Sequence, residues 1–598
     1  MKRPPPLALC LLLPLLVAVC AWAPSTLARD FAFDDREAIV GNPVVEGSLP
    51  AREAFLRDYW HHIGDAGHYR PLATLSLRAD HAQFDTWVVG YHLKNLFLQI
   101  LVVGLACALT LTHFERPRVV LLGLSVFAAH PALADSVAWV SGRTSMLGAM
   151  GPIFGAILIT TALRLHSKRT ALTLAVVGGA LGLISGLLGK EEAIVFPLLY
   201  WLLSWRRSRA VAVASLVGSL IGLACYLSLR ARALGSPLPS APFAPLAGEP
   251  IGTRLLFAGR GLLEAGRLAI APFHFPPNYR AAPGLSPGAM PAQWAWAGWV
   301  GYLGALTLGG HLLWKNYGLV GGGARARIAA GGGILLALVA WAPFTQIVPA
   351  GEIFAPRFLY LPLLFLSPAL GMLMLKLPRG VIALVLLGLC SGAWRSSASY
   401  VDRENYARAI LAHIPDDVGA WNDLGLALEE TGHVQEAAEA WQEGLARDSN
   451  YARIWSNLGR HQLASGLLEE AETSLRRAVA NSKRNPIARC NLGALLLRQG
   501  RAAEAEEAYL DAARIAPGMA PAWRGLANAR LRLGKLTECG TALGEALAQD
   551  PTDGLAIAIG MRLKRTLENP GAATQGAQEP GDAAANAAGS LEIEDAPK

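Results

Sequence analysis

The chain has 598 residues, of which 53% are hydrophobic and 16% are charged, and its formal net charge is +8. A soluble domain carries about 25% charged residues, so this composition excludes a purely soluble protein. Residues 1–400 contain 49 charged residues and the shorter stretch 401–598 also contains 49, so a charge-poor part precedes a part of soluble composition. The seven cysteines form no CxxC pair and indicate no disulfide framework.

The charge-poor part contains eleven apolar runs that could span a membrane, although one of them, 192–205, is short. A spanning helix needs about 20 mostly apolar residues. This number of runs excludes an enzyme held by a single signal anchor and is typical of polytopic transporters and transferases. We predict spans at 6–28, 93–113, 119–139, 145–163, 171–189, 192–205, 210–229, 292–313, 328–346, 358–375 and 380–396.

The first run has a second interpretation as a secretory signal peptide. Lys2 and Arg3 precede its apolar core, and Thr26-Leu27-Ala28 resembles a cleavage site. Both interpretations place residue 30 onward outside the cytoplasm.

Basic residues in short loops predict the orientation of the remaining spans, because such loops favour the inner side of a membrane. Whether the segment 255–275 crosses the membrane decides the side on which every later loop lies. Its charged residues Arg260, Glu264 and Arg267 lie on one stripe of a helix. Each charge at a bilayer centre costs roughly 2.5–3.5 kcal/mol, so we predict an interfacial or re-entrant helix here. The region after the last span then lies outside. The loops that fall inside are 113–118, 164–169 and 205–209, whereas Arg230, Arg232 and Arg395 fall outside against the rule.

The first outer loop, 30–92, is long and polar and contains the adjacent carboxylates Asp34 and Asp35. Such a pair beside a membrane could act as a general base with a positioning group, or as cation ligands. The alternative is a solvated turn or helix cap. His61, His62 and His68 crowd the same loop, where we favour a solvated polar segment over a metal site.

Further ionisable residues recur at the same predicted outer face. Ionisable groups at membrane depth indicate a functional site by default, although each could also form an interhelical ion pair. Cations there could hold a phosphate, and a carboxylate could accept a hydroxyl proton. The sequence contains no glycine-rich nucleotide loop, HExxH or GxSxG motif, so neither a nucleotide-using cytosolic enzyme nor a nucleic-acid partner is indicated. The residues are His130, Asp135, Arg143, Lys190, Glu191, Glu192 and Arg357.

Residues 415–551 repeat with a period of 34, which predicts about four tetratricopeptide (TPR) repeats of paired helices. Several independent columns keep this register, which disfavours a generic helical bundle. TPR arrays usually bind proteins or peptides on their concave face. The tail 567–598 is rich in Gly, Ala, Gln and acidic residues, and we predict that it is disordered. The columns are Leu424, Leu458, Leu492 and Leu526; Gly432, Gly466, Gly500 and Gly534; and Ala437, Ala471, Ala505 and Cys539.

Together these motifs resemble the TPR-bearing polytopic O-mannosyltransferases, the TMTC proteins and their bacterial relatives, within the wider GT-C glycosyltransferase superfamily. The resemblance extends over nearly the whole chain, and the order and spacing of the motifs are more specific than any one of them. The matching stretches are FAFDDREAIVGNPVV (31–45), HYRPLATLSL (68–77), GYHLKNLFL (90–98), HPALADSVAWVSGR (130–143), GKEEAIVFPLLY (189–200) and PRFLYLP (356–362).

The resemblance implies an enzyme that uses a polyprenyl-phosphate-linked sugar, with mannose as the expected sugar, on the outer side of the membrane. An acidic pair in the first outer loop is then at the catalytic centre, which corresponds to Asp34 and Asp35. The acid would deprotonate a Ser or Thr hydroxyl of an acceptor protein recruited by the TPR array. The lipid phosphate would leave with its charge held by cations, for which the candidates are Lys190, Arg357, Arg143 and Arg70.

Departures from the family pattern concern the donor side of the predicted site. Pro356 stands where the family often has Glu, Gln99 where it often has His, and Asp135 where it often has Glu. These differences leave open the identity of the donor and the role of the 350–357 loop. No cofactor is implied beyond the lipid-linked sugar as donor substrate, and the need for a divalent cation stays open.

The resulting prediction is an all-α protein of a bacterial inner membrane, with a GT-C-like bundle of about 11 spans followed by a TPR α-solenoid. Two alternatives remain. The acceptor could be a lipid or an envelope glycan, or the protein could be a non-catalytic scaffold, which would need neither the acidic pair nor so many spans. A transporter is disfavoured because the ionisable groups lie near one face and not at midplane. The predicted parts are 1–29, 30–92, 93–396, 397–566 and 567–598.

Overall fold

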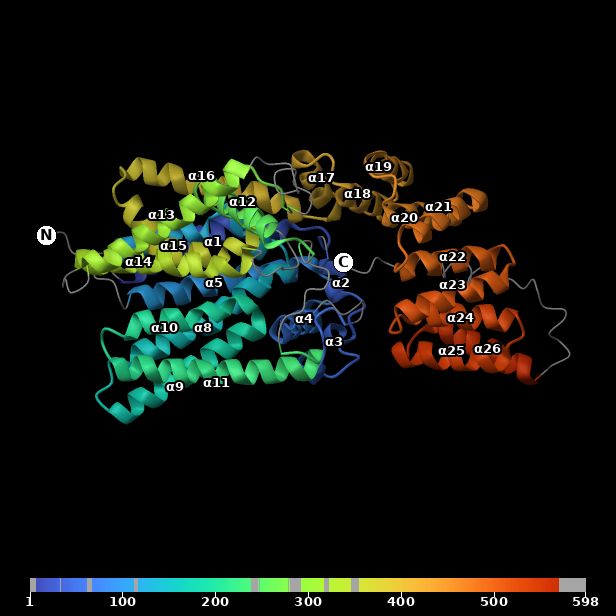
Figure 1. Cartoon of the computed structure of the whole chain (residues 1–598), viewed down its shortest axis with the longest axis horizontal. Helices are drawn as coiled ribbons and strands as arrows, with labels where there is room; N and C mark the ends of the chain where they lie inside the picture. The colour runs from blue at the N-terminus through green and yellow to red at the C-terminus, as the bar shows by residue number, and fades with distance from the viewer. Residues whose placement is uncertain are drawn as a thin grey trace. The chain divides into compact units, whose positions relative to one another are not determined.

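The computed structural model describes residues 7–32, 34–61, 67–111, 117–237, 246, 248–277, 279, 292–316, 322–345 and 354–568. Over these residues the chain is α- and 3₁₀-helical with no β-strand, so the predicted all-α class is confirmed (Figure 1). The chain divides into two compact units, one with the described residues up to Pro415 and one with those from Asp416 onward. Residues 397–415, which the sequence analysis grouped with the repeats, lie in the first unit.

The first unit is a bundle of long apolar helices joined by short helical segments (Figure 1). Its α-helices are α1 (Leu7–Trp22), α2 (Asp35–Ile39), α3 (Pro43–Glu46), α4 (Pro71–Phe84), α5 (Val88–Leu111), α6 (Pro117–Ala128), α7 (Ala134–Val137), α8 (Thr144–Ala162), α9 (Lys168–Gly189), α10 (Phe196–Ser204), α11 (Arg209–Leu234), α12 (Ile251–Ile270), α13 (Ala292–Asn316), α14 (Gly322–Trp341), α15 (Tyr360–Met374), α16 (Arg379–Ser397) and α17 (Arg403–His413). The 3₁₀ segments include η2 (Ala51–Phe55), η3 (Pro131–Leu133), η4 (Ser141–Arg143), η5 (Glu191–Val195), η8 (Pro356–Leu359) and η9 (Ala398–Tyr400).

Eight of the eleven predicted spans correspond to helices that could cross a membrane. Seven stretches in the described residues are long and apolar enough, and the bent pair Arg118–Ala128 with Pro131–Val137 makes an eighth. The bend of 57° falls at His130 and Pro131, because proline cannot continue the hydrogen-bond ladder of the preceding helix. By length and composition, the described residues therefore give seven or eight of the eleven predicted spans. The seven are Val88–Leu111, Ser141–Ala162, Lys168–Gly189, Arg209–Leu234, Ala326–Phe344, Pro356–Met374 and Arg379–Tyr400.

The other three predicted spans are not among these candidates, for different reasons. The first run lies partly outside the described residues, and its described part gives an apolar helix, Leu12–Leu27. The run 192–205 gives α10, which has only nine residues, whereas a spanning helix needs about 20. The third, α13, has 25 residues, a length of about 37 Å at 1.5 Å per residue, but glycine and tryptophan lower its mean hydropathy. Trp294 and Trp314 stand exposed near its two ends, about 30 Å apart along the axis, which is the placement typical of interfacial aromatic residues.

The helices α9 and α11 end near the same point, which explains why α10 is needed. Lys190 follows the last residue of α9, and Arg230, near the end of α11, lies 3.9 Å from Glu191. Since two successive parallel helices require a return path, the chain between them must run back along the bundle through η5 and α10. The predicted run 192–205 is this return path. The helix α12 carries Arg260, Glu264 and Arg267 and is not among the candidate spans, and its interfacial placement stays a prediction.

Small residues let the central helices α8, α9 and α11 approach closely. A Cβ atom on Gly179 of α9 would lie 2.2 Å from the carbonyl oxygen of Ser215 on α11, so no larger residue fits there. A Cβ on Gly155 of α8 would meet the carbonyl of Gly178 at 2.4 Å. Contacts of this kind are how helices associate in lipid, where burial of apolar surface adds little.

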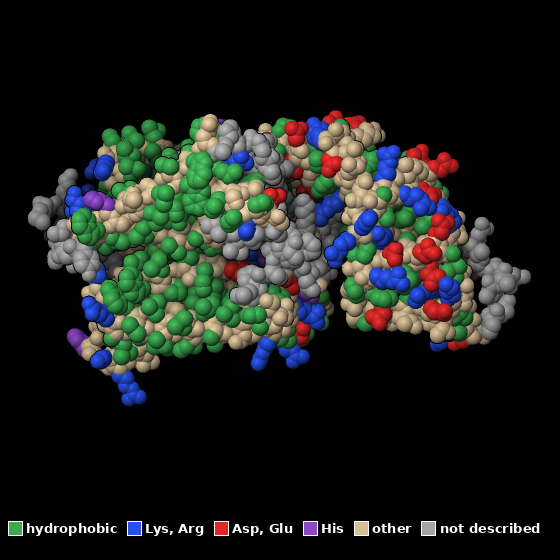
Figure 2. All heavy atoms as spheres, viewed as in Figure 1, with side chains coloured by type: hydrophobic (Ala, Val, Ile, Leu, Met, Phe, Trp, Pro, Cys, Tyr) green, Lys and Arg blue, Asp and Glu red, His purple; other side chains and the backbone are tan. Residues whose placement is uncertain are grey.

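Hydrophobic side chains also cover the outer surface of the first unit. Figure 2 shows them spread over the face in view, with basic side chains at its edges, whereas the second unit presents mixed acidic and basic side chains. Exposed examples on α11 and α16 are Leu220, Leu384 and Leu387, each more than 60% exposed. An exposed apolar surface of this extent marks a membrane-facing region.

The second unit consists of antiparallel helix pairs in the predicted 34-residue register. The predicted glycine column closes the turn within each pair: Gly432, Gly466, Gly500 and Gly534 have φ between +72° and +83°, a conformation that L-residues rarely adopt. Residues from 569 onward, including most of the predicted tail, lie outside the described residues. The pairs are α18 (Val418–Glu430) with α19 (Val434–Arg447), α20 (Ala452–Ala464) with α21 (Leu468–Asn481), α22 (Pro486–Arg498) with α23 (Ala502–Ile515) and α24 (Ala520–Arg532) with α25 (Leu536–Gln549), followed by α26 (Gly554–Glu568).

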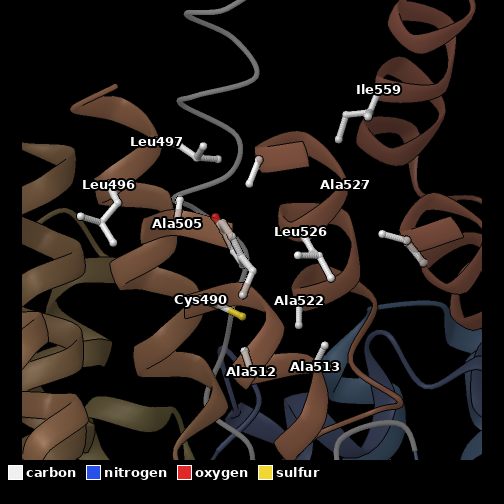
Figure 3. Packing of buried hydrophobic residues seen from close by; sticks show 14 of the residues in the cluster. Cys490, Leu496, Leu497, Ala505, Ala512, Ala513, Ala522, Leu526, Ala527 and Ile559 are labelled. Atoms are coloured by element: carbon white, nitrogen blue, oxygen red, sulfur yellow. The ribbon is translucent and has the colours of Figure 1, made fainter. Parts of the chain in front are cut away.

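The alanine and leucine columns form the core of this unit (Figure 3). Ala505, Ala512 and Leu526 are fully buried there, together with Cys490, whose burial raises the pKa of its thiol to about 12. Burial of such repeated apolar faces stabilises each pair only through its neighbours. The predicted α-solenoid is thereby confirmed.

Candidate active site

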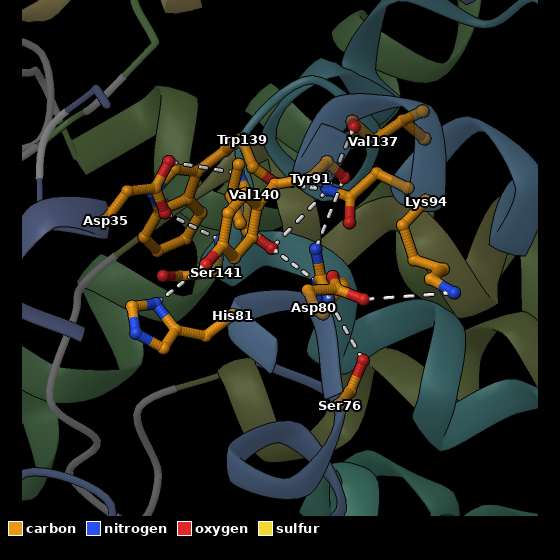
Figure 4. Close-up of polar contacts among 12 residues, drawn as sticks. Asp35, Ser76, Asp80, His81, Tyr91, Lys94, Val137, Trp139, Val140 and Ser141 are labelled. Carbon is orange, nitrogen blue, oxygen red and sulfur yellow. Dashed lines mark hydrogen bonds and ion pairs between the residues drawn. The ribbon is translucent and has the colours of Figure 1, made fainter. Parts of the chain in front are cut away.

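Asp35 is the first residue of α2 and is completely buried. Its Oδ1 accepts a hydrogen bond from the Ser141 amide at 2.7 Å, and its Oδ2 accepts one from the Val140 amide at 3.1 Å (Figure 4). Burial raises the pKa of Asp35 to about 7, against the opposing effect of these hydrogen bonds. Because both carboxylate oxygens are engaged by backbone amides, Asp35 joins the acidic loop to the segment that follows α7.

Asp34 occupies the N-cap position of α2, but its side chain makes no capping bond and is partly exposed. Its charge acts on the hydroxyl of Tyr59, which is buried beside it. Burial raises the pKa of Tyr59 well above its ordinary value, and the charges of Asp34, Arg70 and Asp35 also act on it. Asp34 is therefore the more exposed member of the pair, although its Oδ1 is buried.

The segment that receives Asp35 is held rigidly by buried polar contacts. The side-chain amide of Asn95 donates to the carbonyl oxygens of Trp139 at 2.9 Å and Val137 at 3.2 Å. Gly142 permits the tight fold, since a Cβ there would lie 2.1 Å from the carbonyl oxygen of Asp135. A fixed backbone at residues 137–142 gives the amides that bind Asp35 a fixed direction.

Arg143 lies in a buried ion pair, not at an open position. It pairs with Asp80 and donates hydrogen bonds to Ser76 Oγ at 3.0 Å and to the Tyr91 carbonyl at 3.3 Å (Figure 4). Lys94 Nζ lies 3.9 Å from Asp80 on the other side. These contacts join α4 and α5 to η4, so the structure gives Arg143 a structural role, and its predicted contact with a phosphate stays a prediction.

The second group of charges surrounds the start of η5. Lys190 pairs with Glu192 and donates to Ser145 Oγ at 2.9 Å. Burial lowers the pKa of Lys190, although the neighbouring Glu192 carboxylate opposes this effect. The cation is thus held between Ser145 of α8 and Glu192 of η5.

Glu191, next in the chain, lies 3.7 Å from Arg70 Nε and 3.9 Å from Arg230 Nη1. Burial by itself would raise the pKa of Glu191, but the charges of Arg70, His68 and Arg230 outweigh it, and the pKa lies below its ordinary value. Arg230 also donates to the Gly67 carbonyl at 2.9 Å. Arg70, on the first loop, is thereby placed against the end of α9.

The third group is the pair Asp135 and Arg357. Arg357 Nη1 donates to Asp135 Oδ2 at 2.9 Å, and its guanidinium carbon lies 5.2 Å from the centre of the Trp139 ring. The hydroxyl of Tyr400 donates to the other oxygen, Oδ1, at 3.3 Å. Arg357 remains partly accessible, with 16% of its side chain exposed, whereas Asp135 is buried. The cation can therefore face a ligand while the carboxylate holds it.

Electrostatic interactions join these groups into one site. The charges of Arg357 and Arg70 both act on Lys190, and Arg70 also acts on Tyr59 together with the two aspartates. Seven of the nine residues predicted from the sequence are thus brought together. His130 is buried with its Nε2 3.4 Å from the Ala269 carbonyl, a contact outside this set. The seven residues are Asp34, Asp35, Arg70, Asp135, Lys190, Glu191 and Arg357.

Sequence reasoning missed several contributors to this site. Tyr59 gave no signal, because a tyrosine beside tryptophan in a polar loop is common. Arg230 gave one, since a cation at the outer end of an apolar run violates the loop rule for orientation. Asp80 and Glu37 lie on helices whose contacts only the tertiary structure sets. Across the described part of the chain, no cluster of three His, Cys, Asp or Glu side chains has metal-site geometry.

Two TPR family models match the second unit and the helix before it. One matches residues 403–453 and 456–520, and the other matches residues 496–559; both are described as tetratricopeptide repeats. Crystal structures of a MamA protein and of pilF from Pseudomonas aeruginosa match with 23% and 19% identity and TM-scores of 0.22 and 0.26. These matches cover 25% and 31% of this chain, and 81% and 83% of the solved chains.

Sequence relatives also match over part of the chain. Protein O-mannosyl-transferase Tmtc1 of Drosophila melanogaster is 28% identical over 233 residues, which cover 35% of this chain and 27% of the relative. Protein O-mannosyl-transferase TMTC2 of Homo sapiens is 33% identical over 128 residues, which cover 20% of this chain and 15% of the relative. The chain therefore spans about a quarter or less of the length of these relatives. The resemblance to TPR-bearing O-mannosyltransferases is confirmed.

Proposed function

We propose that this protein is a membrane glycosyltransferase that moves a sugar from a polyprenyl-phosphate donor to Ser or Thr hydroxyls of an acceptor protein. The relatives are named protein O-mannosyl-transferases, so mannose is the proposed sugar. The observation that carries the proposal is the acidic pair at the start of α2, where Asp35 is locked to two backbone amides and Asp34 stays partly exposed. A scaffold would have no need for a carboxylate held in this way.

Asp34 is the proposed general base. As the acceptor oxygen attacks the anomeric carbon, its proton passes to the Asp34 carboxylate, a carbon–oxygen bond to the acceptor forms, and the bond between the anomeric carbon and the phosphate oxygen breaks. Asp35 does not take part in proton transfer; it fixes the direction of Asp34 through the chain. General-base catalysis by a positioned carboxylate contributes typically 10²–10⁴-fold.

Arg70, Lys190 and Arg357 are the proposed phosphate ligands. The leaving polyprenyl phosphate gains one negative charge in the reaction, so cations that are already fixed in place stabilise the transition state more than the ground state. Each of the three is held by a carboxylate, respectively Glu191, Glu192 and Asp135. These partners prevent three buried or half-buried cations from repelling one another when the donor is absent.

The chain leaves the first unit beside the loop that carries the acidic pair. The carbonyl oxygen of Val401 accepts hydrogen bonds from the amides of Arg29 at 2.8 Å and Asp30 at 3.2 Å. Residues just after the first apolar helix and just after the last one are therefore on the same side of the bundle. This supports the proposed orientation, in which the acidic loop and the repeats both lie on the outer side of an inner membrane.

The test is sugar transfer in membranes that contain the full chain, Asp34→Asn, Asp35→Asn or the control Asp85→Asn at matched protein levels. Asp85 lies in the same loop with 83% of its side chain exposed. A labelled polyprenyl-phosphate mannose is supplied, and label is followed into protein and lipid fractions separately. We expect transfer into protein by the wild type and the control, and a loss of about 10²-fold or more in Asp34→Asn.

The fractions separate the alternatives. Label in lipid or glycan, and not in protein, would assign the acceptor to the cell envelope. If wild type, control and both site variants behave alike with an active donor present, the acidic pair is not catalytic and a scaffold function replaces the proposal.

A further inference from the structure

The helix that carries the acidic pair is too short to hold its own position. α2 has five residues, little more than one turn, and helices of this length have no independent stability in water. Its direction must therefore be set by contacts with other segments. Asp35 provides one contact at its first residue, through the amides of residues 140 and 141.

A second contact holds the opposite side of this helix. Glu37 Oε1 accepts a hydrogen bond from Arg403 Nη2 at 2.9 Å, and the two side chains are only 15% and 10% exposed. Arg403 is the first residue of α17, which begins directly after the last apolar helix and its 3₁₀ extension. An ion pair shielded in this way is stronger than an exposed one.

The residues just before Arg403 touch the rest of the site. The Val401 carbonyl oxygen accepts hydrogen bonds from the amides of Arg29 and Asp30, in the segment that leads into the acidic pair. The hydroxyl of Tyr400 donates to Asp135, the carboxylate that holds Arg357. Three residues of the segment 400–403 thus make these contacts: Arg403 with the acidic helix, Val401 with its approach segment, and Tyr400 with the carboxylate behind a proposed phosphate ligand.

We propose that Arg403 is a positioning residue of the active site, which orients Asp34 by holding Glu37, and that segment 400–403 closes the site from the C-terminal side. This rests on the proposed function for the role of Asp34. Positional errors of about 1 Å at a reacting group cost up to roughly 10²-fold in rate, so loss of this contact has a large effect without any contact to substrate.

The experiment compares full-chain variants in membranes: Arg403→Ala, Arg403→Lys, Glu37→Gln and the charge exchange Glu37→Arg with Arg403→Glu. The matched control is Arg408→Ala, on the same helix, because Arg408 is 52% exposed and pairs with Glu404, one turn before it. Initial rates are measured per folded molecule over a range of donor concentrations. Hydrogen exchange of the amides of residues 35–40 is measured on the same preparations.

We expect Arg403→Ala and Glu37→Gln each to lower kcat by about tenfold or more with little change in the donor KM. A double variant that combines Arg403→Ala with Glu37→Gln, made alongside them, should be no slower than either single variant, because both substitutions remove the same contact. Arg403→Lys and the charge exchange should recover part of the rate, and exchange in α2 should quicken in the slow variants only. A merely structural role would reduce the amount of folded protein and leave the rate per folded molecule unchanged.

Hydrogen exchange keeps this proposal separate from the proposed function. If the wild type transfers no sugar but exchange in α2 quickens in Arg403→Ala and not in Arg408→Ala, the transferase assignment fails and the positioning role stands. If exchange in α2 is the same in Arg403→Ala as in wild type, or if Arg403→Ala keeps the full kcat, the positioning role is refuted.

Discussion

Asp35→Asn should change how the stability of the first unit depends on pH. Burial raises the pKa of Asp35 from 3.8 to about 7. The folded state therefore binds more protons than the unfolded state between about pH 4 and pH 7, and this carboxyl destabilises the fold progressively as the pH rises through that window. One pKa unit corresponds to about 1.4 kcal/mol, and the slope falls as Asp35 becomes half ionised near pH 7, so the stability difference between wild type and variant should shift by about 2 kcal/mol from pH 5 to pH 7.

The sign of the effect is specific. Asparagine does not ionise, so the variant lacks this pH-dependent destabilisation. The free energy of unfolding of the wild type should therefore fall relative to that of Asp35→Asn as the pH rises. At low pH the wild type should be the more stable of the two. Asparagine offers one oxygen to two amides, so one hydrogen bond of about 1 kcal/mol is lost in the variant.

The assay is denaturant unfolding of the full chain in detergent at pH 5, 6, 7 and 8, with the exposed Asp85→Asn as the control. The stability of the control relative to wild type should follow no such course. A difference between wild type and Asp35→Asn that stays constant over this range would refute the reasoning, because it would mean that Asp35 is not a buried carboxyl with a raised pKa.

Three further predictions follow from packing and ion pairs. Gly142→Ala should lower transfer by about tenfold or more at normal protein levels, because the added Cβ would lie 2.1 Å from the Asp135 carbonyl and displace the amides that hold the acidic loop; unchanged rates would contradict this. Arg357→Ala should cost about 3 kcal/mol in unfolding titrations, since it removes the cation opposite a buried carboxylate, and adding Asp135→Asn should recover much of the loss. Gly425→Val should destabilise the repeats by about 1–3 kcal/mol, because a Cβ there would lie 2.2 Å from an indole nitrogen on α19. The control Gly544→Val, where a Cβ would lie in open space, should not destabilise them, and limited proteolysis of the full chain distinguishes the two variants.

Periodic patterns made most of the fold predictable. The 34-residue columns give the helix pairs and their turns directly, because a glycine at positive φ and a small residue at each close contact are local requirements. Long apolar runs likewise give eight spans. The count failed where hydropathy and length are poor guides: α10 is a short return helix, and α13 contains glycine and tryptophan in place of aliphatic residues.

The site was predictable to a lesser degree. The sequence places charged residues at the ends of apolar runs, and such residues meet where those ends lie on one side of the bundle. It does not show which partner each one takes. Arg143 and Arg357 look alike in sequence, yet one is buried against Asp80 and the other stays partly accessible beside Asp135.

The all-α class, the apolar helices, the repeat array and the acidic pair after the first apolar run could all be predicted from the sequence alone. Composition, periodicity and residue order carry that information, since each depends on neighbours along the chain. The tertiary contacts show that Asp35 is the buried, hydrogen-bonded aspartate and that Asp34 is partly exposed, and they bring Arg403 to the acidic helix across 366 positions of sequence. Such roles depend on burial and on partners far apart in the chain, and no local pattern records them.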